Sequence, residues 1–386
     1  MRLCEAEAKA LLASRGIAIP RGHLVDTTGS PSFDTFSSGG AAKAQLLAGG
    51  RGKSGLVRLA ASAQELTQQV GALRALLAES GSPARILVEE RLEIACEYYL
   101  AFVIDDVLQR PKLLFSREGG IHIEDATQGV HAYGVEPGGE LRPHQLLPFF
   151  SGAGINGTVL GPLTRLAVAL HRCFVSEDLE MLEINPLALT AQGRLVPLDA
   201  KIVLDDSAMW RHRDRRTSMS AELEAAERTP LEREAAEAGF TFVEMPGDVA
   251  LMSSGAGLGM MLVDLIGQVG LQPACFVDGA FGSHGDQTAE RLALVMKRAE
   301  SADVRAILFY QNLGTRDLKP RIESLLKILQ ASPPPKPFYF GMSATYLAER
   351  NMTAKRACEL MREHGFFASD EPRELVARIR EDLSRT

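Results

Sequence analysis

The stretch EINPLALTAQGRLVPLDAKIVLDD, from Glu183 to Asp206, places apolar runs on both sides of a short turn. The turn is Ala191-Gln192-Gly193, and its glycine stands where a left-handed backbone is needed, which is a favoured hairpin connection. The stretch therefore predicts a β-hairpin whose residues face one another in pairs outward from the turn.

The register of this hairpin predicts a polar face. Counting back from the turn sets Asn185 opposite Asp199 and Glu183 opposite Lys201. Because side chains alternate along a strand, all four share one face. Opposed β-carbons lie about 5 Å apart, so one Mg²⁺ ion, a hard cation that prefers oxygen ligands, reaches both an amide and a carboxylate. A solvated face with a cross-strand ion pair explains the same spacing, and both interpretations stay open at this point.

Composition bounds the class of protein. With 386 residues the chain is too long for one ordinary core, so two or three domains are expected. A formal net charge of −7 disfavours a general nucleic-acid binder, and no apolar run approaches the roughly 20 residues of a membrane span. The N-terminal segment is a predicted amphipathic helix that Gly16 ends, not a signal peptide. Five scattered cysteines without a CxxC pair favour reduced thiols, a cytoplasmic location and no zinc site.

Two patterns of predicted strands and helices divide the chain. Residues 1–240 mix antiparallel strands with helices, which is an α+β pattern, and end in a charged, helix-rich connector over 211–240. In residues 241–386, strands alternate with helices of ten or more residues, which predicts an α/β unit with a doubly wound, mainly parallel sheet. We therefore predict a domain boundary near residue 240.

Basic and acidic residues of the first domain suggest a nucleotide site. Lys43 is followed seven residues later by the loop Gly50-Arg51-Gly52-Lys53, in which glycines let the backbone approach phosphates and cations neutralise them. The spacing is not that of a Walker A loop. Glu89 at the end of one predicted strand and Glu97 at the start of another are suited to accept hydrogen bonds from a nucleoside. Surface charge is the alternative explanation.

Four segments together resemble the β subunit of succinyl-CoA synthetase: KAQLLAGGRGKSG, ILVEERLEIACEYYL, FSREGGIHIED and the hairpin stretch. Their order and spacing match this family from residue 1 to about 212, and malate–CoA ligase and ATP-citrate lyase share the similarity. The resemblance implies an ATP-grasp domain over 1–240, with a lid subdomain at about 20–105, and a flavodoxin-like domain over 241–386. It implies an ADP- or GDP-forming acid–thiol ligase.

The resemblance also assigns roles to residues. Mg²⁺ is held by Asn185 and Asp199, and Glu183 lies near a phosphorylated histidine during phosphoryl relay. That histidine belongs to a separate, CoA-binding α-type subunit, so the resemblance implies a hetero-oligomer. ATP or GTP is bound by a set of seven residues: Lys43, Gly50, Arg51, Gly52, Glu89, Leu92 and Glu97.

The second domain departs from the family where the acid substrate is handled. Ser254 stands where the family has Asn before its GAGLAM motif, and GAFGSHGDQT replaces the family's GGGAT loop. Gly314 and Thr315 still offer a turn before a helix, and a helix N-terminus favours a carboxylate. We expect these three residues to contact a carboxylic acid, without assigning it as succinate; decay of the acid site explains the same departures. His284 is interpreted as a loop histidine and not as the relay histidine.

Three functions remain as hypotheses. The favoured one is the ATP-grasp subunit of an ADP-forming acyl-CoA ligase, working with an α-type chain. A ligase that captures an acyl phosphate with an amine, and needs no CoA, is the enzymatic alternative. A non-catalytic nucleotide-binding subunit is the third, and the presence of Lys43, Arg51, Asn185 and Asp199 together argues against it.

Overall fold

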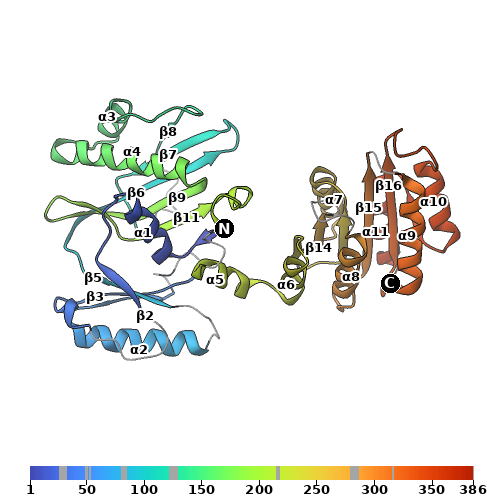
Figure 1. Cartoon of the computed structure of the whole chain (residues 1–386), viewed down its shortest axis with the longest axis horizontal. Helices are drawn as coiled ribbons and strands as arrows, with labels where there is room; N and C mark the ends of the chain where they lie inside the picture. The colour runs from blue at the N-terminus through green and yellow to red at the C-terminus, as the bar shows by residue number, and fades with distance from the viewer. Residues whose placement is uncertain are drawn as a thin grey trace. The chain divides into compact units, whose positions relative to one another are not determined.

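The computed structural model describes residues 1–25, 33–47, 51, 54–79, 85–120, 129–213, 218–278, 287–314 and 317–385. The chain separates into two compact units, Met1–Glu227 and Arg228–Thr386 (Figure 1), so residue 240 lies just inside the second unit. Each unit has its own sheet structure and its own core. In the part of the chain that is described, no helix has the length and apolar content to cross a membrane.

The larger sheet of the first unit is antiparallel throughout its described ladders and follows the order β1-β11-β9-β6-β7-β8, with β10 beside β9. Its strands are β1 (Arg2–Leu3), β6 (Ile94–Asp105), β7 (Arg110–Ser116), β8 (His131–Gly134), β9 (Leu179–Thr190), β10 (Leu195–Pro197) and β11 (Ala200–Leu204). Apolar residues of α1 (Glu5–Ser14), α3 (Pro143–Gly152) and α4 (Leu160–Ser176) share one buried core with this sheet. The sheet therefore has a covered face that fixes its register.

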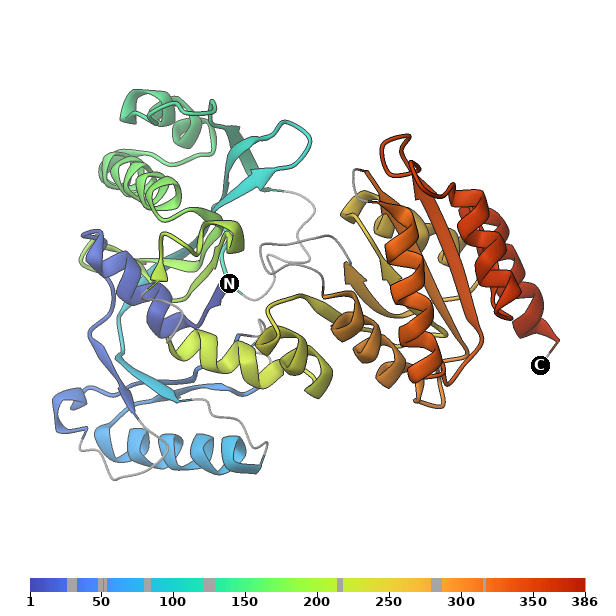
Figure 2. The same cartoon turned by 45° about the vertical axis from the view of Figure 1, so that its right-hand side comes forward.

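A smaller antiparallel sheet has the order β2-β5-β3-β4, formed by β2 (Gly22–Val25), β3 (Gly40–Ala44), β4 (Val57–Ala60) and β5 (Ile86–Glu90). Helix α2 (Ala63–Glu79) lies along one face of this sheet (Figures 1 and 2). Leu66, Val70, Leu73 and Leu77 recur at helical spacing, and all four are buried against the sheet. The first unit also contains α5 (Met219–Glu227) and the short 3₁₀ helices η1 (Asp34–Phe36), η3 (Gly157–Val159) and η4 (Asp206–Ala208).

The predicted hairpin is confirmed. Leu189 pairs with Leu195 next to the turn, and Glu183 pairs with Lys201 farther along, as counted from the sequence. Gly193 has a φ of 75°, in the left-handed region that favours glycine. The turn chemistry and the alternation of side chains were therefore sufficient to set this register.

The second unit has a six-stranded sheet in the order β12-β14-β13-β15-β16-β17 among its described residues. All neighbours are parallel except β12 with β14. The strands are β12 (Phe242–Glu244), β13 (Val249–Ser253), β14 (Pro273–Asp278), β15 (Ala306–Leu313), β16 (Phe338–Ala344) and β17 (Phe367–Ser369).

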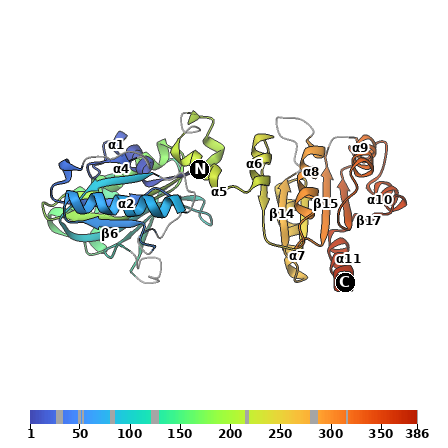
Figure 3. The ribbon, with the colours of Figure 1, turned by 90° about the horizontal axis from the view of Figure 1, so that it is seen from below.

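Helices cover both faces of this sheet (Figure 3). One buried core contains residues of α6 (Pro230–Glu237), α8 (Thr288–Ala299), α9 (Leu318–Ala331) and α10 (Ala354–Glu363). A separate core contains residues of α7 (Ala256–Gln268) and α11 (Pro372–Ser384). The predicted combination of an α+β unit followed by a doubly wound α/β unit is therefore confirmed.

Candidate functional site

A cavity of about 1250 Å³ lies within the first unit. It is lined by residues from both of its sheets, including the polar face of the hairpin, and by the start of α1. Eight of the predicted site residues line it: Lys43, Arg51, Glu89, Leu92, Glu97, Glu183, Asn185 and Asp199. Gly50 and Gly52, which we also predict for this site, lie outside the described residues. Residues far apart in the sequence thus converge on one concave wall.

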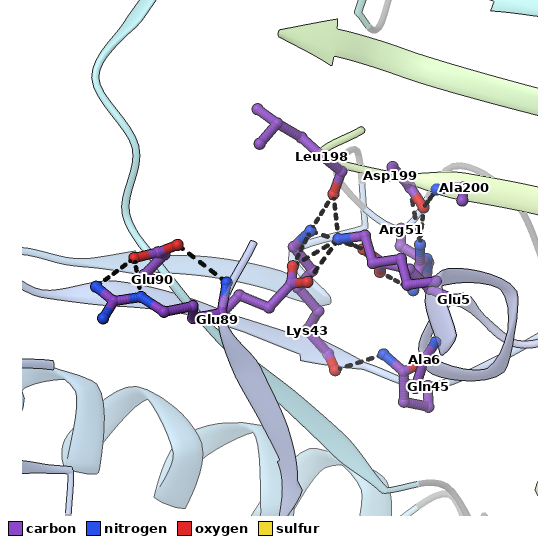
Figure 4. A network of polar contacts seen from close by, with 12 residues as sticks. Glu5, Ala6, Lys43, Gln45, Arg51, Glu89, Glu90, Leu198, Asp199 and Ala200 are labelled. Carbon is purple, nitrogen blue, oxygen red and sulfur yellow. Dashed lines mark hydrogen bonds and ion pairs between the residues drawn. The ribbon is translucent and has the colours of Figure 1, made fainter. Parts of the chain in front are cut away.

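Buried ion pairs form one wall of the cavity (Figure 4). The ammonium of Lys43, on β3, lies 2.7 Å from Glu5 Oε1 and 2.8 Å from Glu89 Oε2. Lys9 Nζ, from α1, donates to both oxygens of Glu89 at 2.7 Å and lies 2.8 Å from Glu5 Oε1. Both lysines also donate to the Leu198 carbonyl. A buried charge is strongly disfavoured unless it is paired, so these four side chains hold one another in place.

Arg51 extends this network to the hairpin. Its Nη2 donates to both carboxylate oxygens of Asp199, at 2.7 and 2.8 Å, while Nη1 lies 2.8 Å from Glu5 Oε2. Nη1 also donates to the Ala44 carbonyl at 3.2 Å. The planar guanidinium therefore bridges two carboxylates, one on helix α1 and one on the hairpin, which are far apart in the sequence. Arg provides this geometry and Lys does not.

The network keeps Glu5, Lys43 and Arg51 charged, whereas burial lowers the pKa of Lys9 and raises the pKa of Asp199. Burial alone raises the pKa of a carboxyl group, but Lys43, Lys9 and Arg51 outweigh burial and hold the pKa of Glu5 well below its usual range. Burial opposes the charge of Lys43 in the same way, and Glu5, Glu89 and Asp199 outweigh it to raise the pKa of Lys43. Lys43 and Arg51 thus face the cavity as permanent cations.

The hairpin supplies the two predicted metal ligands. The ladder is interrupted between the pairs Leu187–Pro197 and Ile184–Ala200. The same register continues on both sides, and Leu198 N–H donates to the Pro186 carbonyl at 3.0 Å, which sets Asn185 across from Asp199. Asn185 Oδ1 accepts the Gly120 N–H at 2.6 Å, and its amide donates to the Gly120 carbonyl at 3.2 Å. Asn185 is therefore held in one orientation.

The donor set fits a divalent cation. An amide oxygen and a carboxylate are hard oxygen ligands, and Mg²⁺ takes its remaining ligands from phosphate and water. A side-chain cation, the Arg51 guanidinium, already lies on Asp199 and shows that this carboxylate attracts positive charge. Among the described residues there is no cluster of three or more His, Cys, Asp or Glu side chains suited to a metal. A metal at this hairpin therefore depends on a ligand that brings further oxygens.

The remaining predicted residues of this cavity have distinct positions. Glu97 lies inside β6, which begins at Ile94 and not at Glu97 as predicted. Leu92 lies in the segment between β5 and β6, half-buried. Glu183 is half-buried opposite Lys201; burial and then the negative charge of Glu183 raise the pKa of Tyr99 to about 12.

Sequence reasoning missed Glu5 and Lys9. Both lie on α1, one turn apart, and their side chains are 0% and 2% exposed. Their i,i+4 spacing was visible, but on an amphipathic helix such a pair usually faces water. Sequence reasoning also assigned Glu89 to the nucleoside; both of its carboxylate oxygens contact lysines in the structure, and that assignment stays a prediction.

The predicted acid site lies at the carboxyl ends of β13 and β15 in the second unit. Ser254 Oγ accepts the Asn312 N–H at 2.7 Å, and Ser254 N–H donates to the Tyr310 carbonyl at 3.1 Å. The Gly314 carbonyl, two residues beyond Asn312, accepts from the Thr345 hydroxyl. Ser254 thus contacts the last residues of β15, the strand that Gly314 directly follows. Thr315 and His284 lie outside the described residues.

The first unit contains a known domain type. Residues 2–189 match the ATP-grasp domain family, which confirms the predicted domain type. In overall structure the chain is similar to ATP citrate lyase from Methanothrix soehngenii, with a TM-score of 0.65, 18% identity, and coverage of 98% of this chain and 99% of the other. That similarity supports the fold.

Sequence similarity is more specific. The chain is 35% identical over 303 residues to the β subunit of a GDP-forming succinate–CoA ligase from Thermus thermophilus, covering 77% of this chain and 79% of that protein. It is 33% identical over 320 residues to an ADP-forming counterpart from Geobacter sulfurreducens, covering 80% and 81%. The chain belongs to the succinate–CoA ligase β-subunit family, whose enzymes are acid–thiol ligases.

Proposed function

We propose that this chain is the nucleotide-binding β subunit of a carboxylate–CoA ligase that acts in the cytoplasm. In this proposal, phosphate passes from Mg·ATP or Mg·GTP through a phosphohistidine on a partner α-type subunit to a carboxylic acid. CoA then captures the acyl phosphate. The observation that carries the proposal is the convergence, in one cavity, of two permanent cations with an amide and a carboxylate across a hairpin.

In this proposal, each group of residues has a separate task. Lys43 and Arg51 bind the nucleotide phosphates, together with the loop of Gly50 and Gly52, and neutralise the charge of the transferring phosphoryl group. Mg²⁺, held by Asn185 and Asp199, supplies further charge neutralisation when it is bound.

The nucleoside and the relay involve other residues of the cavity. Glu89, Leu92 and Glu97 are proposed to contact the nucleoside. Glu183 is proposed as the acidic residue that meets the partner's phosphohistidine. It lies in mid-strand opposite Lys201, in the same cavity as Asn185. A carboxylate at this position orients an imidazole and stabilises its charged form.

The acid is proposed to bind at Ser254, Gly314 and Thr315. The Ser254 hydroxyl already accepts a backbone N–H, so less of its hydrogen-bonding capacity remains for a ligand. An Asn at this position, as in the family, offers a longer amide. We therefore propose a carboxylic acid whose identity is to be found by screening, with succinate as one candidate.

The test is nucleoside diphosphate release from Mg·ATP and from Mg·GTP, with and without an α-type subunit of the same family. Succinate, malate, citrate and other carboxylates are supplied with and without CoA. Release that requires the acid, CoA and partner together supports the proposal and names the acid. Release that requires the acid but not CoA indicates an acyl-phosphate ligase. Nucleotide binding without release under any condition indicates a non-catalytic subunit.

A further inference from the structure

Helix α1 places a carboxylate at the centre of the cation cluster. The Glu5 side chain has no solvent exposure and lies against the cavity that we assign to the nucleotide. A buried carboxylate without partners is costly enough that it is normally found paired. The position of Glu5 is therefore tied to the positions of its cations, and theirs to Glu5.

Glu5 joins the two cations that we assign to phosphate. Its Oε1 lies 2.7 Å from Lys43 Nζ, and its Oε2 lies 2.8 Å from Arg51 Nη1. Two like charges repel at this range, so a shared carboxylate is needed to hold them close together. Lys43 and Arg51 come from separate segments, and Glu5 fixes the spacing between them (Figure 4).

Among the charged residues of the network, Glu5 is the one suited to hold Lys43 and Arg51 together. The network contains three carboxylates and three cations: Glu5, Glu89, Asp199, Lys9, Lys43 and Arg51. Asp199 is the proposed metal ligand, so its pairing with Arg51 has to loosen when a metal binds. Glu89 contacts Lys43 and Lys9, whereas the ion pairs of Arg51 within the described residues are with Glu5 and Asp199. Glu5 contacts both phosphate-binding candidates and is neither a metal nor a nucleoside residue in the proposed function.

We propose that Glu5 is a positioning residue of the nucleotide site, which holds Lys43 and Arg51 side by side so that both reach the outer phosphates of one nucleotide. The inference rests on the proposed function, because that function assigns the phosphates to these cations. Glu5 acts through Lys43 and Arg51 and touches no reacting atom. Its loss therefore changes the binding of phosphates and leaves the binding of the nucleoside in place.

The deciding variant is Glu5→Asp, which keeps the charge and shortens the side chain by one methylene. Calorimetry on the full chain measures the affinity for AMP and for Mg·ATP, with GMP and Mg·GTP in parallel. We expect the gain in affinity from AMP to Mg·ATP to fall about tenfold, the effect of misplacing one hydrogen bond to a charged group. AMP, which lacks the outer phosphates, keeps its wild-type affinity.

Glu7→Asp is the matched control on the same helix. Its carboxylate accepts the N–H groups of Met219 and Ser220, at 2.9 and 3.0 Å, at the start of α5. The same chemical change therefore disturbs a helix contact outside the cation cluster. For Glu7→Asp we expect a lower midpoint of thermal unfolding and an unchanged gain in binding affinity from AMP to Mg·ATP. An equal loss of this gain in both variants assigns the effect to general structure and overturns the inference.

A second variant covers the case in which Glu5→Asp does not fold. Glu5→Gln combined with Lys9→Met removes one charge of each sign, so the network stays neutral. A tenfold smaller gain in affinity from AMP to Mg·ATP in this double variant supports the positioning role of Glu5. A change in the net charge of the network does not explain it, because that charge is unchanged. A wild-type gain in either folded Glu5 variant overturns the inference. A wild-type chain that shows no gain from AMP to Mg·ATP refutes the proposed function instead.

Discussion

The two candidate sites of this chain are built in different ways. The cavity of the first unit is lined by charged side chains that come from distant segments and pair with one another while buried. The strand-end site of the second unit uses a hydroxyl and backbone groups of neighbouring parallel strands. The first arrangement depends on every partner being present, whereas the second is provided largely by the sheet. Mutations should therefore affect the two sites very unequally.

The largest expected effect is on the stability of the first unit. Lys9→Met leaves two buried carboxylates with fewer cations, and we expect the free energy of unfolding to fall by about 3–5 kcal/mol. Urea unfolding followed by the fluorescence of Trp210, the single tryptophan, reports on this unit. Lys319→Met in the second unit is the matched control, because the Lys319 side chain is 55% exposed and its ammonium lies 3.9 Å from Glu323. We expect a change of about 0–1 kcal/mol there, measured by circular dichroism; equal losses in the two units contradict the contrast.

The next effect concerns metal-dependent turnover. Asp199→Ala removes a proposed metal ligand and the carboxylate to which Arg51 Nη2 donates. If the metal stabilises the transition state by several kcal/mol, we expect the rate of nucleoside diphosphate release to fall at least roughly a hundredfold. Asp105→Asn, at the end of β6 and paired with Lys112, is a control in the same unit. An unchanged rate of nucleoside diphosphate release in Asp199→Ala contradicts the assignment of Asp199 as a metal ligand.

Acid should weaken the first unit through Glu5. Its pKa is lower in the folded than in the unfolded chain, so its contribution is fully present above the unfolded value. The contribution declines as the pH falls below about 4.5, by at most about 1.4 kcal/mol per pH unit. We expect Trp210 fluorescence in urea to show a shallower acid dependence for Glu5→Gln combined with Lys9→Met than for wild type. Identical slopes indicate that Glu5 is not held ionised.

The smallest effect is expected at the strand-end site. Ser254→Ala removes the acceptor for the Asn312 N–H, and the sheet around it remains intact. We expect a loss of about 1 kcal/mol in the stability of the second unit and a raised KM for the acid, with unchanged nucleotide affinity. A changed nucleotide affinity contradicts the separation of roles between the two sites.

The sequence predicted what depends on local rules. The turn at Gly193 and the alternation of side chains sufficed to pair Glu183 with Lys201 and to set Asn185 across from Asp199. The alternation of strands and long helices likewise sufficed for the doubly wound unit. In both cases, the signal lies between residues that are close in sequence.

The sequence did not predict contacts that packing alone creates. Nothing in the spacing of Glu5 and Lys9 shows that α1 turns them into the protein, because their partners Lys43 and Glu89 lie on β3 and β5, far along the sequence. The pairing of Arg51 with Asp199 was also not predicted. The sequence assigned phosphate to Arg51 and a metal to Asp199, whereas in the structure the two side chains form an ion pair. A charged residue in a sequence does not reveal which opposite charge it meets.

The place of α1 in the chain has a consequence for biosynthesis. Lys9 emerges from the ribosome 190 residues (199 − 9), and Glu5 194 residues (199 − 5), before the hairpin reaches Asp199 and completes the network. At synthesis rates of about 5–20 residues per second, this interval is roughly 10–40 s. Until β3 with Lys43 and β5 with Glu89 have been synthesised, the helix is a nascent segment with both signs of charge and no partner strand. Charged side chains favour water, so the groups that organise the finished cavity also keep the nascent helix hydrated before its partner strands exist.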